Sequence, residues 1–179
     1  MLTLLRTLWM RVRLRRDPIG FARSLGVTIG RDCRLLGTTL GTFGSEPYLI
    51  TIGDHVTITI GVRFSTHDGG VWVFREQYPD IDVVAPITIG NNVFVGMNAL
   101  ILPGVTIGDD CVIGAGSVVN RDIPSGSVAA GVPARVIRPV AEYWERIRDR
   151  AFHVRSLPLE EKKQVYMDAL KPGGRGAGR

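Results

Sequence analysis

The chain has few of the residues that build disulfide frameworks, metal centres or membrane spans. Only two cysteines and three histidines occur among its 179 residues. Cys33 and Cys111 show no metal-ligand spacing. No stretch approaches the roughly 20 apolar residues that a membrane helix requires, and Arg6 interrupts the early apolar run with no small-residue cleavage site after it. These absences predict a cytoplasmic protein without a metal site.

Acidic residues are also fewer than basic ones. The sequence has 17 Asp and Glu against 22 Lys and Arg, a formal net charge of +5. Arginines gather before the first acid, Asp17, and again at Arg121, Arg135 and Arg138. This excess favours an anionic partner: a nucleic acid, a membrane surface or a phosphorylated cofactor. No aromatic residues alternate with the arginines as a stacking platform would require, which argues against nucleic acid.

Glycine, in contrast, is abundant, with 22 residues and no collagen period. This content predicts many tight turns. Hydrophobic residues make up 45% of the chain, which excludes general disorder, and the length fits one domain with a core.

A six-residue period runs through the middle of the chain. From Ile89 to Val118, five hexapeptides follow one another, each with Ile or Val first and a small or apolar residue fifth. The pattern also appears from Ile29, from Ile52 and from Ile58. Both cysteines occupy fifth positions, which predicts buried residues without a redox role.

This period fits neither an amphipathic helix nor an alternating strand, whose periods are near 3.6 and 2. It predicts a prism in which each hexapeptide forms one short strand and a corner, and three hexapeptides complete a coil. Branched residues fill the interior, and coils stack at about 4.8 Å, as strands do. Each coil buries its apolar edge against its neighbours. The predicted fold is all-β, a parallel β-helix.

The repeats resemble those of the hexapeptide-repeat acyltransferase family over roughly residues 26–139. The resemblance implies a left-handed parallel β-helix. Handedness rests on the resemblance alone, because the general crossover rule favours right-handed connections. The resemblance also implies acyl transfer from acetyl-CoA and a homotrimer with active sites between adjacent subunits.

The repeat region divides the chain into predicted segments. Residues 1–25 form a basic helix that caps the prism or touches an anionic membrane surface. Residues 26–139 form the β-helix, interrupted by an insertion loop at 68–86 whose aromatics favour packing, for example on a neighbouring subunit. Residues 140–170 are helical, and residues 171–179 form a flexible tail.

His67 is the candidate catalytic base, because it directly precedes the insertion loop. His55 falls at an ordinary corner and His153 in the predicted C-terminal helix. The resemblance implies that a histidine at the base of such a loop removes the proton of the attacking alcohol or amine, for which imidazole is suited. A carboxylate on its other nitrogen would orient it. Glu76 is favoured because it lies well into the loop. The candidates are Asp68, Glu76, Asp80 and Asp82.

The closing segments Ile113–Pro124 and Ala130–Arg138 resemble the CoA-binding end of sugar and xenobiotic acetyltransferases. Small residues there let the backbone approach the pantetheine arm, and arginine matches phosphate geometry. The resemblance implies a set of cofactor-binding residues: Met97 and Ala115 at the pantetheine arm, Asn120 and Arg121 further along, and Arg135 and Arg138 at the nucleotide phosphates.

Some residues depart from the sugar enzymes of the family. Phe94 stands where Trp is common, Asn120 where Thr is common and Arg121 where Lys is common. The chain also lacks the N-terminal helical region of maltose and galactoside acetyltransferases, and its loop after His67 is longer. These differences favour short O-acetyltransferases from polysaccharide and lipopolysaccharide gene clusters.

The leading interpretation is an acetyl-CoA-dependent O-acetyltransferase that acts on a sugar hydroxyl in surface-glycan assembly. One alternative is an N-acetyltransferase of an amino sugar or antibiotic. A non-catalytic β-helix scaffold is the alternative from another class. Zinc-binding relatives need three histidines, and only His55 and His67 lie in the repeat region.

Overall fold

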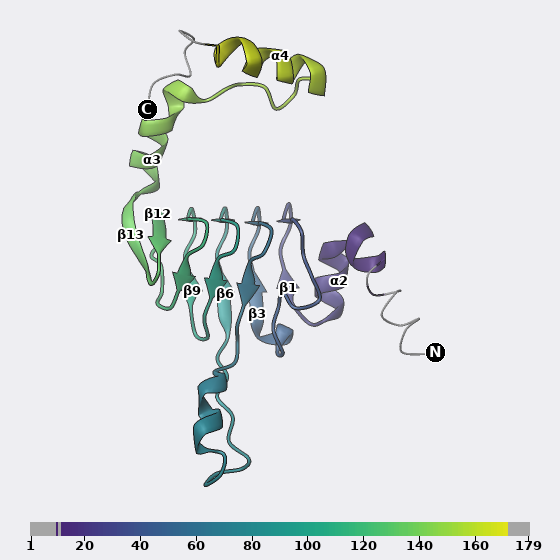
Figure 1. Ribbon diagram of the computed structural model, residues 1–179, viewed down its shortest axis with the longest axis vertical. Coiled ribbons are helices and arrows are strands. Elements are labelled where there is room, and N and C mark those ends of the chain that lie inside the picture. The colour runs from purple at the N-terminus through teal and green to yellow at the C-terminus, as the bar shows by residue number, and fades with distance from the viewer. Residues whose placement is uncertain (1–9, 11, 172–179) are drawn as a thin grey trace. The chain divides into compact units, whose positions relative to one another are not determined.

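The computed structural model describes residue 10 and residues 12–171. The chain forms two compact units, Met1–Val140 and Ala141–Arg179. Within the described residues, all strands belong to the first unit (Figure 1).

Short strands of the first unit form three sheets. The four-stranded sheet contains β1 (Thr28–Ile29), β3 (Ile50–Ile52), β6 (Ile87–Ile89) and β9 (Thr106–Ile107). The three-stranded sheet contains β5 (Arg63–Phe64), β8 (Leu100–Ile101) and β11 (Val118–Val119). The six-stranded sheet contains β2 (Arg34–Leu35), β4 (Thr57–Ile58), β7 (Phe94–Val95), β10 (Val112–Ile113), β12 (Ser127–Gly131) and β13 (Ala134–Pro139).

The chain passes through these sheets in rotation. β6, β7 and β8 belong to three different sheets, and each pairs in parallel with the strand three hexapeptides further on, namely β9, β10 and β11. One passage through the three sheets therefore makes a coil, and successive coils stack (Figure 1). The sheet-rich architecture with helices towards its ends is confirmed.

The first residue of each hexapeptide points into the core. Ile89, Val95, Ile101, Ile107 and Ile113 are all at most 1% exposed. Burying one such side chain contributes about 1.5–3 kcal/mol, so the stacked rows form the main stabilising feature. The fifth positions are buried as well, which confirms the burial predicted for both cysteines.

The first coil departs from the repeat between β2 and β3. Here the backbone carbonyl of Thr42 accepts a hydrogen bond from the amide of Phe64 at 2.9 Å. The Phe43 ring stacks on the Phe64 ring with centroids 5.7 Å apart. Two aromatic rings thus fill the interior where no hexapeptide is available. A 3-10 helix, Pro47–Leu49, then leads into β3.

Helix α2 (Pro18–Ser24) packs Phe21 and Ala22 into the core near the first coil. The Asp17 carboxylate accepts a hydrogen bond from the amide of Gly20 at 2.8 Å and caps this helix. The predicted N-terminal helix falls largely on residues 1–9 and 11, outside the described residues, although residues 12–16 are helical. Among the described residues, α2 buries apolar side chains against this end of the core.

At the other end, β13 runs antiparallel to β12, which the hexapeptide pattern did not predict. The reversal follows Gly131, whose φ of +105° suits a residue without a Cβ atom. The strands form a hairpin that extends the six-stranded sheet.

The second unit contains most of α3 (Val140–Ile147), the 3-10 helix Arg148–Arg150 and α4 (Leu159–Ala169). The prediction of helix across residues 151–157 is wrong, and His153 lies in this non-helical stretch. Pro158 disfavours helical backbone at Leu157, the residue directly before it. The predicted tail lies outside the described residues from 172 onwards. No helix among the described residues has the length and apolarity to cross a bilayer.

Candidate active site

His67 lies where the chain leaves the three-stranded sheet after β5. It forms an isolated antiparallel bridge with Val84, and the amide of Asp68 donates to the carbonyl of Val83 at 2.8 Å. The insertion therefore leaves and re-enters the coil through one paired neck. Backbone pairing of this neck holds His67 at the base of the loop.

Two carboxylates approach the same ring nitrogen of His67. Its Nδ1 atom lies 3.4 Å from Asp82 Oδ1 and 3.7 Å from Glu46 Oε1. This Nδ1 atom is buried, and it makes no hydrogen bond within the part of the chain that the structure describes. The other carboxylate oxygen of Glu46 accepts a hydrogen bond from Thr66 Oγ1 at 2.9 Å. The imidazole thus presents one nitrogen to an acidic pair.

Glu76, favoured from the sequence as the residue that orients His67, is exposed and is not among these contacts. The carboxylates that lie beside His67 are instead those of Asp82, which was among the candidates from the sequence, and Glu46, which was not. The reason is the local backbone: the loop enters a 3-10 helix at Gly69–Phe74, after which Glu76 is exposed, and the irregular returning segment brings Asp82 back to the neck, next to the bridge between Val84 and His67.

Sequence reasoning missed Glu46 because it lies outside the hexapeptides, in the irregular part of the first coil. A signal was nevertheless present. The repeat is interrupted twice, by the irregular stretch before β3 and by the insertion loop before β6. These two strands pair in parallel, with Ile50 opposite Ile87. Residues a few positions upstream of each strand therefore meet, which places Glu46 close to Asp82.

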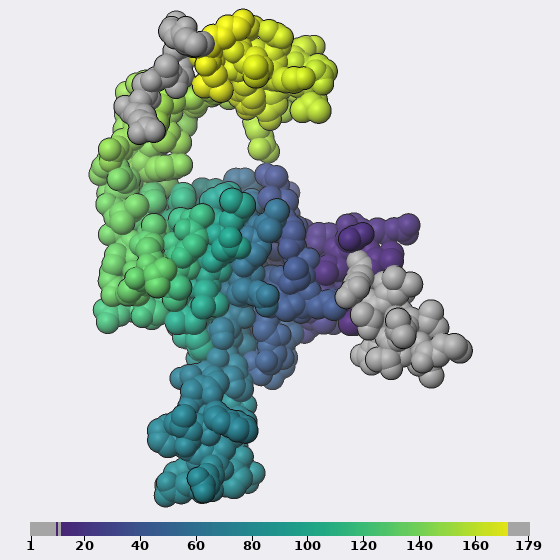
Figure 2. Space-filling model, in the orientation of Figure 1, coloured from purple at the N-terminus to yellow at the C-terminus, as the bar shows by residue number. Residues whose placement is uncertain are grey.

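The insertion loop presents apolar side chains to solvent at its tip. Trp72, Val73 and Phe74 are 72%, 73% and 57% exposed. The Arg75 guanidinium lies over the Trp72 ring at 6.0 Å from its centroid, and Arg75 Nε donates to the carbonyl of Ile81. The loop, drawn in teal, projects from the stacked coils (Figure 2). The outer apolar surface of this loop is uncovered within the described chain.

Met97 and Ala115, predicted at the pantetheine arm, lie on neighbouring coils. The amide of Gly116 donates to the carbonyl of Met97 at 2.7 Å, and both predicted side chains are exposed. They precede β8 and β11, so they lie at the edge where strands of the three-stranded sheet begin.

The terminal hairpin adjoins this corner. The amide of Gly131 donates to Ser117 Oγ at 3.2 Å, and Ala130 pairs with Arg135 on β13. Arg135 is exposed, and Arg138 lies further along the same strand. The structure thus brings the Met97–Ala115 corner and the predicted phosphate-binding strand together.

Asn120 and Arg121 lie elsewhere, at the corner that follows β11. Both are exposed. His67 also follows a strand of this sheet, β5, and the three strands are parallel. In one chain, His67, Asn120 and Arg121 therefore share one edge of the three-stranded sheet, and Met97 with Ala115 lies at the opposite edge.

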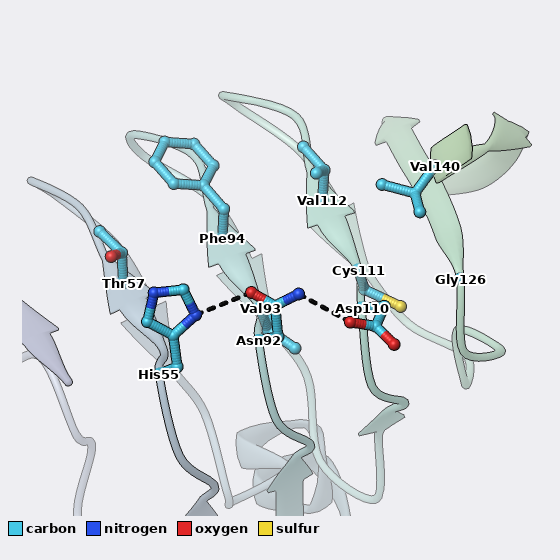
Figure 3. A pocket seen from close by; sticks show the side chains of 10 residues that line it. All are labelled: His55, Thr57, Asn92, Val93, Phe94, Asp110, Cys111, Val112, Gly126 and Val140. Carbon is cyan, nitrogen blue, oxygen red and sulfur yellow. Dashed lines mark hydrogen bonds between the residues drawn. The ribbon is translucent and has the colours of Figure 1, made fainter. Parts of the chain in front are cut away.

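A groove of about 430 Å³ lies apart from His67, on the outer face of the six-stranded sheet (Figure 3). Phe94 and Val112 contribute apolar walls. Its rim is a hydrogen-bonded row in which His55 Nδ1 meets Asn92 Oδ1 at 2.8 Å and Asn92 Nδ2 donates to Asp110 Oδ1 at 2.7 Å. His55 is exposed. This row links three coils at one corner.

Cys111 also borders the groove, but it is poorly suited to act as a nucleophile. Burial raises the pKa of the Cys111 thiol, and the Sγ atom donates to the carbonyl of Pro124 at 3.2 Å. The reactive thiolate is therefore disfavoured.

Comparisons with known proteins agree with the geometry. The family model described as bacterial transferase hexapeptide (six repeats) matches residues 86–121. Protein CapG of Staphylococcus aureus is 51% identical over 162 residues, which cover 90% of this chain and 92% of that protein. Galactoside O-acetyltransferase of Escherichia coli is 40% identical over 80% of this chain and 66% of its own length. The chain belongs to the hexapeptide-repeat acyltransferase family.

A solved structure supports this assignment. A hexapeptide-repeat-containing acetyltransferase of Vibrio cholerae, complexed with acetyl-CoA, superposes with a TM-score of 0.54 at 26% identity. The match covers 73% of this chain and 82% of the other. As a family member, this hexapeptide-repeat chain is an acyltransferase.

Proposed function

We propose that this acyltransferase moves the acetyl group of acetyl-CoA to a sugar hydroxyl, in the cytoplasmic assembly of a surface polysaccharide or lipopolysaccharide. The coils would wind as a left-handed parallel β-helix. The observation that carries the proposal is His67, which stands at the neck of an inserted loop with one nitrogen facing two carboxylates. The O-acetyltransferase relative and the acetyl-CoA complex support the acceptor chemistry and the donor.

In the proposed reaction, His67 Nε2 takes the proton of the acceptor hydroxyl as its oxygen attacks the thioester carbonyl. A C–O bond forms, the tetrahedral intermediate collapses, the C–S bond breaks, and the imidazolium returns the proton to the CoA thiolate. General-base catalysis contributes roughly 10²–10⁴-fold to such a step. Backbone amides at a coil corner would stabilise the oxyanion.

The donor would lie along the corner of Met97 and Ala115. Their stacked, exposed backbone leaves room for the extended pantetheine arm, whereas a bulky residue at Ala115 would block it. Arg135 and Arg138 on the adjoining strand would meet the nucleotide phosphates, because a guanidinium matches phosphate geometry and charge. Asn120 and Arg121 would contact the cofactor further along.

A homotrimer would complete the site. In one chain, His67 and the Met97–Ala115 corner lie at opposite edges of the three-stranded sheet. If the His67 edge of one chain packed against the Met97–Ala115 edge of its neighbour, the base would lie beside the acyl group of the bound donor. The uncovered apolar tip of the insertion loop offers a surface for that contact.

A subunit-mixing experiment tests the shared site. His67→Ala removes the base, and Ala115→Trp blocks the donor groove. If sites form between chains, refolded mixtures of the two inactive variants contain some sites with both wild-type residues and regain activity. Mixtures that remain inactive, in trimers of confirmed mass, would place the whole site in one chain.

The proposed activity is tested by following CoA release from acetyl-CoA with sugars, nucleotide-sugars, amino sugars and aminoglycosides. Turnover that requires a sugar hydroxyl and collapses in His67→Ala supports the proposal. Turnover only with amines would support N-acetyl transfer to an amino sugar or antibiotic. A chain that does not bind CoA would support the scaffold interpretation.

A further inference from the structure

The two carboxylates beside His67 have different surroundings. Asp82 is half exposed, and its Oδ1 atom already accepts a hydrogen bond from the amide of Val83 at 2.9 Å. The same oxygen lies 3.7 Å from Arg75 Nη2. Asp82 is thus engaged by the loop itself, and its negative charge is offset by a nearby guanidinium.

Glu46 is better placed to act on His67 alone. Its side chain is only 15% exposed, and it comes from a different coil. Its Oε2 atom accepts the hydroxyl hydrogen of Thr66, a residue that is 1% exposed. Since Thr66 holds one oxygen, the other, Oε1, is left facing His67 Nδ1.

His67 Nδ1 itself is closed to water and makes no hydrogen bond among the described residues. A buried nitrogen of this kind requires a partner. A modest side-chain movement from 3.7 Å would bring Glu46 Oε1 into hydrogen-bond range, and catalytic contacts commonly tighten when substrate binds.

We propose that Glu46 is the positioning residue of His67. It holds the proton of the neutral imidazole on Nδ1, leaves Nε2 free to act as the base, and stabilises the imidazolium that forms when Nε2 takes the acceptor proton. Thr66 fixes the carboxylate, and Asp82 with Arg75 shapes the loop. This inference rests on the proposed role of His67 as the base.

The Glu46→Gln variant gives a sharp test, because the buried Thr66 hydroxyl favours one orientation of the amide. Among the described residues, position 46 offers the only acceptor for this hydroxyl hydrogen, which would be left unpaired if Thr66 accepted from the amide instead. We therefore expect Thr66 to donate to the carbonyl oxygen of Gln, which leaves the amide NH₂ group facing His67 Nδ1. The imidazole then accepts at Nδ1 and carries its proton on Nε2, where it cannot act as a base. We expect kcat to fall about 10²-fold with little change in KM for acetyl-CoA.

Asp82→Asn is the matched control and should lower kcat by less than about tenfold. Selective ¹⁵N-histidine NMR reports the tautomer directly: Nδ1–H at His67 in the wild type and in Asp82→Asn, and Nε2–H in Glu46→Gln. A purely structural role of Glu46 would not move the proton from one ring nitrogen to the other.

A double variant distinguishes an effect of the amide orientation at position 46 from a general disturbance of the fold. In Thr66→Val, nothing directs the amide of a Gln at position 46, so it can turn its carbonyl oxygen toward Nδ1–H. We therefore expect Glu46→Gln to cost less kcat in the Thr66→Val background than alone. Additive losses would contradict the proposed alignment.

The outcomes distinguish this inference from the proposed function. Loss of kcat, an Nε2–H tautomer and rescue by Thr66→Val support it. An active Glu46→Gln beside an inactive His67→Ala overturns the role of Glu46 and leaves the base in place. A larger loss in Asp82→Asn than in Glu46→Gln would also overturn it. Full activity in His67→Ala would remove the proposed base itself.

Discussion

Gly96 packs so closely on Ala115 that a Cβ atom on Gly96 would lie 2.5 Å from the Ala115 amide nitrogen. The amide of Gly96 also donates to the carbonyl of Ile113 at 2.8 Å. Two coils therefore meet, backbone on backbone, beside the predicted donor groove. The spacing at this corner depends on the missing side chain.

Gly96→Ala should therefore force two coils apart. Overpacking of this kind costs about 1–3 kcal/mol, and a lower thermal midpoint at fixed protein concentration would measure it. Gly69→Ala is the control, since a Cβ atom there meets nothing within 4 Å. Equal midpoints for both variants would mean that this corner adapts more readily than its packing indicates.

The rows of buried branched residues should respond strongly to truncation. Ile107 is 0% exposed and pairs in register with Ile89. Ile107→Ala leaves a cavity between coils and should lower the free energy of unfolding by about 2–5 kcal/mol. Ile137, which is half exposed on β13, provides the comparison. Denaturant unfolding of both variants checks the difference, and a similar small loss in each would contradict it.

Arg135→Gln should weaken donor binding more than catalysis. If the guanidinium meets a CoA phosphate, KM for acetyl-CoA rises about tenfold while kcat changes little. Added salt should reduce the difference in KM for acetyl-CoA between Arg135→Gln and the wild type, because salt screens the contact between the Arg135 guanidinium and the phosphate. Arg146→Gln, on α3, is the charge-matched control. An unchanged KM in Arg135→Gln would exclude this phosphate contact.

Cys111 should react with thiol reagents only when the coils open. Burial raises its pKa, so at about pH 8 less of it is thiolate than of an ordinary cysteine, and labelling should accelerate as the pH rises further. A Cys33→Ala variant isolates the signal. Colorimetric labelling of native and denatured protein checks the prediction, and fast labelling of the native form would contradict it.

The sequence was most informative where neighbouring residues determine the outcome. A branched first residue and a small fifth residue define each strand and corner locally, so the burial of Ile101, Val105 and Cys111 follows from spacing alone. His67 could be found because the period stops directly after it. These features need no knowledge of distant contacts.

The features of the fold and of the candidate site that the sequence did not predict depend on contacts between segments outside the repeat. Glu46 reaches His67 only because the non-repeating part of one coil lies against the neck of the next. Glu76 was preferred because linear distance along the loop says nothing about the 3-10 helix that carries it away. The reversal at β13 depends on the turn after Gly131 and on antiparallel pairing with β12, which a hexapeptide pattern does not encode.

That reversal has a consequence for assembly. A stack of parallel strands would expose, at its last coil, the same backbone groups that every inner coil uses, and the first coil of another molecule could dock there and start a growing fibre. On the six-stranded sheet, β13 crosses this position in the opposite direction. A strand that approaches in the direction of the repeat would therefore meet an antiparallel edge, so the parallel pairing of the inner coils does not continue past β13 on that face.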